Sequence, residues 1–359
     1  MRRIVPILIM FAISVPGDAA TRQEPEPIAK LELSQLLRAV SPEHVSATLT
    51  FVTDESIAVG VCSGYAPRTC SLSLIREEHG RLETVAATQD FGPSVANLHR
   101  APGEKILATS VPGSAILYSA DLSSKQSLQP VSAVSFSGRT VGQWLQGGWR
   151  IRQIDPSEPI RSGKGSMRSV SDDVVVFQNG DVMYTEAVDG TPVASFTVAS
   201  ESKCATLAQV LQGGRLYIEG CKENRIVDFS GKTKLKVQRP KGWSSNSSEL
   251  DRASADGSRL LFNSWSRKVS FFRSVGETAA VFATLGMGAG EEEDNREEIR
   301  VIDTNDGNIC FERHRSFPMG SETVFHNNAA ISPSGRFVAI AADGELSVYQ
   351  ISAVCGRDN

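Results

Sequence analysis

The chain has 359 residues, of which 40% are hydrophobic, 22% charged and 7% aromatic. This is the composition of a globular protein, and it excludes a disordered or collagen-like chain. The 37 basic and 41 acidic residues give a formal charge of −4, which argues against nucleic-acid binding, because a nucleic-acid surface carries clustered Lys and Arg.

Residues 1–19 have the pattern of an export signal. Arg2 and Arg3 precede an apolar run from Ile4 to Val15, and Gly17-Asp18-Ala19 forms a small-x-small cleavage site. The run is shorter than the roughly 20 residues that a membrane-spanning helix needs. We therefore expect cleavage after Ala19, a mature chain without a membrane span, and a secreted or periplasmic location. An uncleaved anchor is the alternative.

The chain from residue 20 divides into an N-terminal segment (20–40), a repeat region (41–353) and a short tail (354–359). Seven hairpins recur in the repeat region, each with a turn rich in Gly, Asp, Ser or Pro between two strand-length runs. They begin at Leu49, Ala96, Val134, Met167, Ala208, Asp251 and Ala329. Their mean spacing of about 47 residues lies within the period of a four-stranded propeller blade.

A second hairpin follows the first in most repeats. These hairpins begin at Ser71, Asp181, Arg225 and Glu298. Two hairpins make one four-stranded antiparallel sheet, which must pack against neighbouring sheets around an axis to bury its faces. The sequence therefore predicts an all-β, seven-bladed β-propeller. The third repeat is the weakest, because the stretch from Gln143 to Gly165 shows few clear strands.

Three segments carry a family resemblance: Ser332–Gln350 (SPSGRFVAIAADGELSVYQ), Ala255–Ser264 (ADGSRLLFNS) and Glu298–Glu312 (EIRVIDTNDGNICFE). They resemble WD40-like repeats of the bacterial exported, YVTN-type propellers, in which a Ser-Pro-Asp-Gly-Arg-type turn joins the first two strands of a blade. The Gly-His start, the Trp-Asp end and the YVTN signature are absent. The resemblance thus implies the propeller fold and no catalytic residues.

The seventh repeat ends after its third strand, at about Ser347 to Ile351. The N-terminal stretch AKLELSQLLRAV (29–40) has no partner in the repeats, so we expect it to supply the fourth strand and close the ring. The alternative is a short amphipathic helix, because Leu31, Leu36 and Leu37 also suit helical spacing.

Six cysteines lie in the mature part, and an even number of cysteines outside the cytosol suggests disulfides. They are Cys62, Cys70, Cys204, Cys221, Cys310 and Cys355. Spacing alone leaves the connectivity open; we expect neighbours to pair, Cys62 with Cys70, Cys204 with Cys221 and Cys310 with Cys355. Free buried thiols are the alternative. Zinc ligation is disfavoured, because the chain has no C-x-x-C pair.

An insertion at about residues 276–298 lengthens the sixth repeat, and a degenerate eighth blade is one alternative for it. It holds an acidic run, Glu291, Glu292, Glu293 and Asp294, followed by Glu297 and Glu298. Clustered carboxylates can bind Ca²⁺, although a like-charge run is more often a solvated surface. Trp243, in the polar loop RPKGWSSNSSE, joins this run as a candidate for ligand binding. The other tryptophans are expected to pack between blades.

Catalytic motifs are missing from the sequence: it has no G-x-S-x-G, H-E-x-x-H, P-loop or G-x-G-x-x-G motif in a suitable context. We therefore favour a monomeric, non-catalytic exported propeller without a cofactor, which binds a protein, peptide or glycan on one rim. The alternative is a propeller hydrolase or lactonase with its site in the central funnel.

Overall fold

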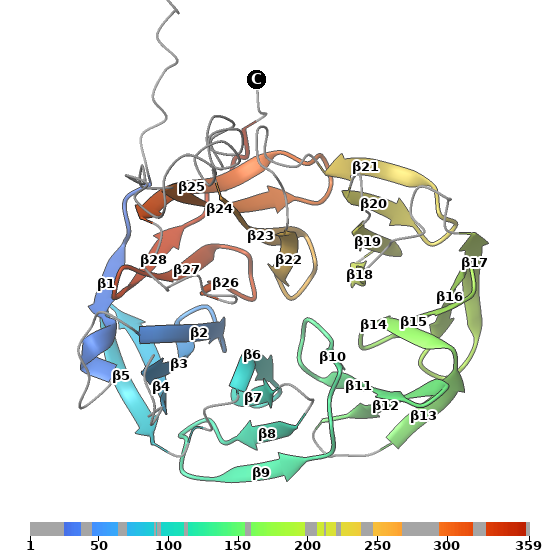
Figure 1. Ribbon diagram of the computed structural model, residues 1–359, viewed down its shortest axis with the longest axis horizontal. Helices are drawn as coiled ribbons and strands as arrows, with labels where there is room; N and C mark the ends of the chain where they lie inside the picture. The colour runs from blue at the N-terminus through green and yellow to red at the C-terminus, as the bar shows by residue number, and fades with distance from the viewer. Residues whose placement is uncertain are drawn as a thin grey trace, which may run out of the picture.

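The computed structural model describes residues 25–36, 45–63, 70–89, 91, 95–110, 114–154, 159–197, 207–211, 213–219, 224–237, 247–267, 294–318 and 328–356. Seven four-stranded antiparallel sheets stand around a common axis (Figure 1). They are the blades of a β-propeller, numbered here 1 to 7 in chain order of their innermost strands. The predicted all-β, seven-bladed fold is confirmed.

The first four blades follow one another in strict chain order, from the innermost to the outermost strand. Blade 1 contains β2 (Val45–Phe51), β3 (Ser56–Ser63), β4 (Cys70–Glu78) and β5 (Arg81–Thr88). Blade 2 contains β6 (Val95–Ala101), β7 (Lys105–Ser110), β8 (Ala115–Tyr118) and β9 (Lys125–Leu128). Blade 3 contains β10 (Ala133–Val134), β11 (Thr140–Leu145), β12 (Gly148–Gln153) and β13 (Pro159–Lys164). Blade 4 contains β14 (Ser166–Val170), β15 (Val174–Asn179), β16 (Val182–Ala187) and β17 (Pro192–Thr197).

The last three blades repeat the pattern, and blade 7 takes its outermost strand from the start of the chain. Blade 5 contains β18 (Leu207–Leu211), β19 (Arg215–Glu219), β20 (Asn224–Asp228) and β21 (Thr233–Val237). Blade 6 contains β22 (Ser247–Ala253), β23 (Arg259–Arg267), β24 (Asp294–Asp303) and β25 (Ile309–Pro318). Blade 7 contains β26 (Ala329–Ile331), β27 (Phe337–Ala342), β28 (Glu345–Gln350) and β1 (Ala29–Glu32).

The hydrophobic core is divided among the spaces between blades. Seven apolar clusters are present in the described residues, and each joins two neighbouring blades. The alternation of apolar side chains along each inner strand explains this division, because successive residues face opposite neighbours. No blade buries both faces without its neighbours, so the ring stabilises itself as a whole.

Serine side chains shape the first turn of several blades. In blades 3, 6 and 7 the serine before the turn accepts a hydrogen bond from the backbone N–H five residues later, at 3.0–3.1 Å; the pairs are Ser135 and Thr140, Ser254 and Arg259, and Ser332 and Phe337. This bond closes the turn locally, which explains why Ser-x-x-Gly segments mark the repeats in the sequence.

The ring closes between the two ends of the repeat region. β1 pairs antiparallel with β28, with Ala29 opposite Val348 and Leu31 opposite Leu346 (Figure 1). The 3₁₀ helix η1 (Leu33–Leu36) follows β1 and buries both of its leucines between blades 7 and 1. Strand closure is therefore confirmed, and among the described residues of this stretch the helical alternative accounts for the turn Leu33–Leu36.

Two of the predicted disulfides are present. Cys62 and Cys70 join directly opposite positions of β3 and β4. The bond between Cys310 and Cys355 ties β25 of blade 6 to the segment after β28. Cys204 and Cys221 lie outside the described residues, so their pairing stays a prediction.

Blade 3 corrects the expectation of few strands between Gln143 and Gly165. That stretch contains the second half of β11 and all of β12 and β13, although the outermost strand β13 is mainly exposed. These strands are polar and rich in glycine, so their sequence carries little alternation. Pairing with the rest of the sheet nevertheless determines their conformation.

Candidate functional site

Two side chains contact blades that are not their neighbours in the ring. Phe136, in the turn between β10 and β11, packs against the apolar cluster that joins blades 5 and 6. Arg100, at the end of β6, donates one hydrogen bond to the carbonyl oxygen of Phe136 and another, at 3.4 Å, to that of Ala253 in β22. Blades 2, 3 and 6 therefore meet near the axis at this end of the ring.

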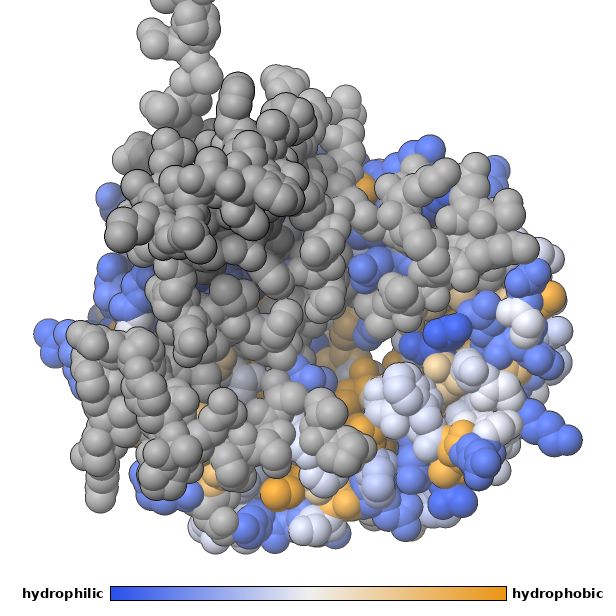
Figure 2. Space-filling model, in the orientation of Figure 1, coloured by the Kyte–Doolittle hydropathy of each residue, from blue (hydrophilic) through white to orange (hydrophobic). Residues whose placement is uncertain are grey.

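The turn that carries Phe136 reaches toward the middle of the ring (Figure 1), and one narrow opening is visible through the molecule in the space-filling view (Figure 2). Gly138 permits this placement. A Cβ atom at residue 138 would lie 1.6 Å from the carbonyl oxygen of Arg100, and the glycine has a φ of +73°. Only a residue without a side chain fits both conditions.

The hairpin between β11 and β12 presents an exposed tryptophan. Trp144 is 62% exposed, and the adjacent Leu145 is 38% exposed. The indole Nε1 of Trp144 donates to the carbonyl oxygen of Met167 in blade 4 at 3.2 Å, and its backbone N–H donates to Ser132 Oγ at 3.1 Å. The Nε1 bond holds the ring of Trp144 in place, the backbone bond fixes the strand that carries it, and most of the side chain stays in solvent.

Trp149 lies directly opposite Trp144 in the hairpin and behaves as predicted for a packing residue. It is buried between blades 3 and 4, its ring centroid lies 5.5 Å from that of Phe177, and its Nε1 donates to the carbonyl oxygen of Lys164. The prediction that tryptophans pack between blades is thus right for Trp149 and wrong for Trp144.

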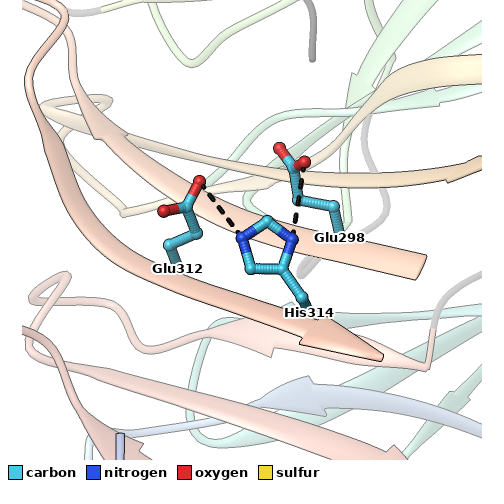
Figure 3. Close-up of side chains that lie close together, drawn as sticks. All are labelled: Glu298, Glu312 and His314. Atoms are coloured by element: carbon cyan, nitrogen blue, oxygen red, sulfur yellow. Dashed lines mark ion pairs between the residues drawn. The ribbon is translucent and has the colours of Figure 1, made fainter. Parts of the chain in front are cut away.

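A cluster of three metal-ligating side chains lies on the outer half of blade 6. Glu298 comes from β24, and Glu312 and His314 come from β25; one potential ligand atom from each lies within 4.8 Å of the others. The imidazole of His314 sits between the two carboxylates (Figure 3), with Nδ1 3.7 Å from Glu298 Oε2 and Nε2 3.6 Å from Glu312 Oε1. We call this the Glu298 cluster.

Arg300 forms an ion pair with Glu298, the buried residue of the Glu298 cluster. The side chain of Glu298 is 5% exposed, and Arg300 Nε lies 2.6 Å from its Oε1 atom. Glu298, Arg300 and Ile302 lie on the same face of β24, because they are two residues apart. Ile302 packs in the apolar cluster between blades 5 and 6. The ion pair therefore orients the carboxylate at the margin of a blade interface and leaves its Oε2 atom on the side of His314.

The neighbouring Glu297 points to the opposite face, toward blade 7. Arg315 donates to its Oε2 atom through Nε and Nη2, at 3.0 and 2.9 Å, and Asn263 and Asn328 donate to Oε1. Glu297 and Glu298 are both buried, so the expectation of a solvated acidic run is wrong for these two residues. Their burial follows from β24, which begins at Asp294 and takes in the last five residues of the range expected for the insertion.

The other predicted binding residues are not brought together by the described part of the chain. Trp243, Glu291, Glu292 and Glu293 lie outside the described residues. Asp294 is the first residue of β24, and its side chain is not described. The calcium site proposed for this run therefore stays a prediction. Sequence reasoning missed the Glu298 cluster, although the alternations Glu298-x-Arg300 and Glu312-x-His314 in two adjacent strands are its signal.

Comparisons with known proteins bear on the fold. No protein-family model and no curated protein matches the chain. A chain of the crystal structure of the mitotic checkpoint complex aligns with 96% of this chain and 99% of its own length, at 12% identity and a TM-score of 0.50. A structure of KlHsv2 with loop 6CD replaced by a Gly-Ser linker aligns with 85% of this chain and 98% of its own, at 11% identity and a TM-score of 0.45. The first likeness supports a WD40-like, seven-bladed propeller fold.

The described residues include no helix long and apolar enough to cross a membrane.

Proposed function

We propose that the chain is an exported, non-catalytic β-propeller that binds a protein, peptide or glycan partner on the rim that carries Trp144. The observation that carries the proposal is the exposure of Trp144 together with its two fixed hydrogen bonds. A large aromatic ring that is already ordered loses little conformational entropy on binding, and tryptophan is enriched at energetic hot spots of interfaces.

The arrangement at the axis supports a rim rather than the funnel as the binding surface. Phe136 and Arg100 occupy space near the axis, and the Glu298 cluster lies on outer strands of blade 6. The hydrolase alternative requires acidic or imidazole groups that converge at the axis from several blades. Because a propeller fold by itself indicates no particular chemistry, the proposal depends on these local features.

Export is part of the same proposal. The disulfides Cys62–Cys70 and Cys310–Cys355 are typical of proteins that mature in an oxidising compartment. The signal pattern of residues 1–19 and the resemblance of the repeats to bacterial exported propellers support this location. Mass spectrometry of the protein recovered outside the cytosol should give a monomer that begins at Ala20. Recovery of a reduced chain that still carries residues 1–19 would contradict export.

The binding proposal is tested with Trp144→Ala against a matched control, Val193→Ala, which removes another exposed apolar side chain from the outer strand β17. Both variants and the wild type are immobilised and offered the exported protein fraction and a glycan array. We expect Trp144→Ala to weaken the captured interaction about thirtyfold, as for the loss of a hot-spot residue, and Val193→Ala to leave it unchanged. Equal binding by all three proteins would overturn the proposal, and the array tells a glycan from a protein partner.

A further inference from the structure

We propose that the Glu298 cluster is a binding site for a divalent transition metal, with Zn²⁺ as the best fit. One imidazole and two carboxylates form a donor set that suits Zn²⁺ and its first-row neighbours, whereas Ca²⁺ and Mg²⁺ prefer oxygen ligands alone. This site shares Glu298 with the carboxylates considered for calcium in the sequence, but it differs in its ion and in its other two ligands, Glu312 and His314.

The spacing of the three ligands sets how far they must move to hold one ion. A zinc ion about 2.1 Å from each ligand atom needs its ligands about 3.4 Å apart in a tetrahedron. With one ligand atom from each residue, the three atoms lie within 4.8 Å of one another, so the set must contract by up to about 1.4 Å to hold the ion. The imidazole lies between the two carboxylates with a different nitrogen nearest each of them (Figure 3). Only one of these nitrogens would ligate the ion, so the exposed His314 ring must turn to bring that nitrogen to both carboxylates.

The strand pairing supplies a preorganised site. Glu298 and His314 are directly opposite each other on β24 and β25, and Glu312 is opposite Arg300 one row away. Side chains directly opposite each other in an antiparallel pair have Cβ atoms about 5 Å apart. The ligands therefore come from a rigid sheet, and Arg300 orients Glu298 from behind, as outer-shell partners of metal ligands do. The positive charge of Arg300 also weakens attraction for a cation, so we expect modest affinity.

An independent observation at this place is the hydroxyl of Ser264. Ser264 lies on β23 directly opposite Glu298, so the two side chains share one face of the sheet. The side chain is buried, and its Oγ atom has no hydrogen-bond partner among the residues that the structure describes. Buried hydroxyl groups are normally satisfied. A metal with three protein ligands keeps an open coordination position for water, and such a water would give Ser264 Oγ its partner.

The site is tested by calorimetric titration of the chelator-treated, full-length protein with ZnCl₂ alone. We expect one zinc ion per cluster in the wild type and an affinity at least tenfold lower in His314→Ala and in Glu312→Gln. Ser264→Ala should weaken binding by a smaller factor, because it removes only the partner of the bound water. The control is His79→Ala, which removes another exposed histidine, in the turn between β4 and β5.

Two outcomes would overturn the proposal: zinc binding that is equal in the wild type and His314→Ala, or no zinc binding by a folded wild type. Because His314 is exposed, its substitution should leave the circular dichroism of the metal-free protein unchanged, which separates lost binding from lost folding. A visible absorption band of the Co²⁺-loaded wild type, absent from His314→Ala, provides a second readout of imidazole ligation. Failure of this test leaves the proposed rim function untouched, because Trp144 belongs to a different blade.

Discussion

Blade 7 and blade 3 share a topology but differ in how their residues are used. Blade 7 has a fully buried innermost strand, β26, and a second strand, β27, in which five of six residues are buried. The innermost strand of blade 3, β10, has two residues, both half-buried, and its outermost strand is mainly exposed. Blade 7 also joins the two ends of the repeat region, through β1 and the Cys310–Cys355 bond.

The most regular blade of this ring and the blade that carries the proposed binding residue are therefore different. The blade that follows the repeat pattern most closely provides burial and closure. The blade that departs from it provides the exposed Trp144 and the turn that reaches the axis with Phe136. We therefore expect substitutions in blade 7 to affect mainly the free energy of unfolding, and those on the surface of blade 3 to affect mainly binding.

The largest expected effect concerns the covalent link beside blade 7. Replacing Cys310 and Cys355 by serine should lower the free energy of unfolding by about 4 kcal/mol, because the bond closes a long loop that contains all three C-terminal strands of blade 7. The same change at Cys62 and Cys70, which close a loop of 8 residues, should cost about 2.5 kcal/mol. Equilibrium urea unfolding measures both; a larger loss for the shorter loop would contradict the chain-entropy explanation.

The core of blade 7 gives the next effect. Leu346 is completely buried opposite Leu31 of the closing strand. Leu346→Ala should reduce the free energy of unfolding by about 3 kcal/mol, through lost burial and the cavity left behind. Trp144→Ala in blade 3 removes a larger side chain and should cost less than about 1 kcal/mol, because most of that surface is already in water. If the tryptophan substitution proved the more damaging, the separation of roles between the blades would be wrong.

A smaller effect is expected at the turn of blade 3. Gly138→Ala should cost about 2 kcal/mol, because it combines an unfavourable positive φ with a backbone contact to Arg100. Gly147→Ala is the matched control: its φ is +77° and no atom lies within 4 Å of the added Cβ, so the expected cost is about 1 kcal/mol. Thermal and urea unfolding give the difference, and equal costs would show that the turn does not approach Arg100 closely.

The smallest effect is a shifted titration in the turn between β8 and β9. Hydrogen bonds from the Ser119 and Ser123 side chains lower the pKa of Asp121 from 3.8 to about 2. Since the folded pKa lies below the unfolded one, the stabilisation is present above pH 3.8 and is lost as the pH falls through about 2. NMR titration should show this low pKa in the wild type and a higher pKa in Ser119→Ala. Ser114→Ala, outside the turn, should leave it low; an unchanged pKa in Ser119→Ala would contradict the assigned cause.

Local signals explain which parts of the fold were predictable. Turns that contain Ser332 and Gly335, or Ser254 and Gly257, are closed by hydrogen bonds within a few residues, so they identify blades without any knowledge of neighbours. Blade 3 has the same signal in its first turn, at Ser135 and Gly138. Its outer strands β12 and β13 have no such turn among the described residues, and their conformation depends on pairing with the rest of the sheet.

The candidate sites were less predictable for a related reason. The register of β24 and β25 places Glu298, Glu312 and His314 next to one another. Ser264 lies in β23, which is 27 residues before β24 in the sequence, counted from Arg267 to Asp294. Only the pairing of β23, β24 and β25 brings these residues together. Trp144 and Trp149 are directly opposite each other in one hairpin. Trp149 is buried against Phe177 of blade 4, whereas Trp144 reaches blade 4 through the hydrogen bond of its Nε1 and stays exposed.

Hydrogen exchange of individual backbone amides under native conditions tests the difference in local stability between blade 7 and blade 3. The separation of roles predicts that amides of β27 in blade 7 exchange only through global unfolding, whereas those of β10 and β11 in blade 3 exchange earlier, through local opening. Equal protection in the two blades, or slower exchange in blade 3 than in blade 7, would contradict it.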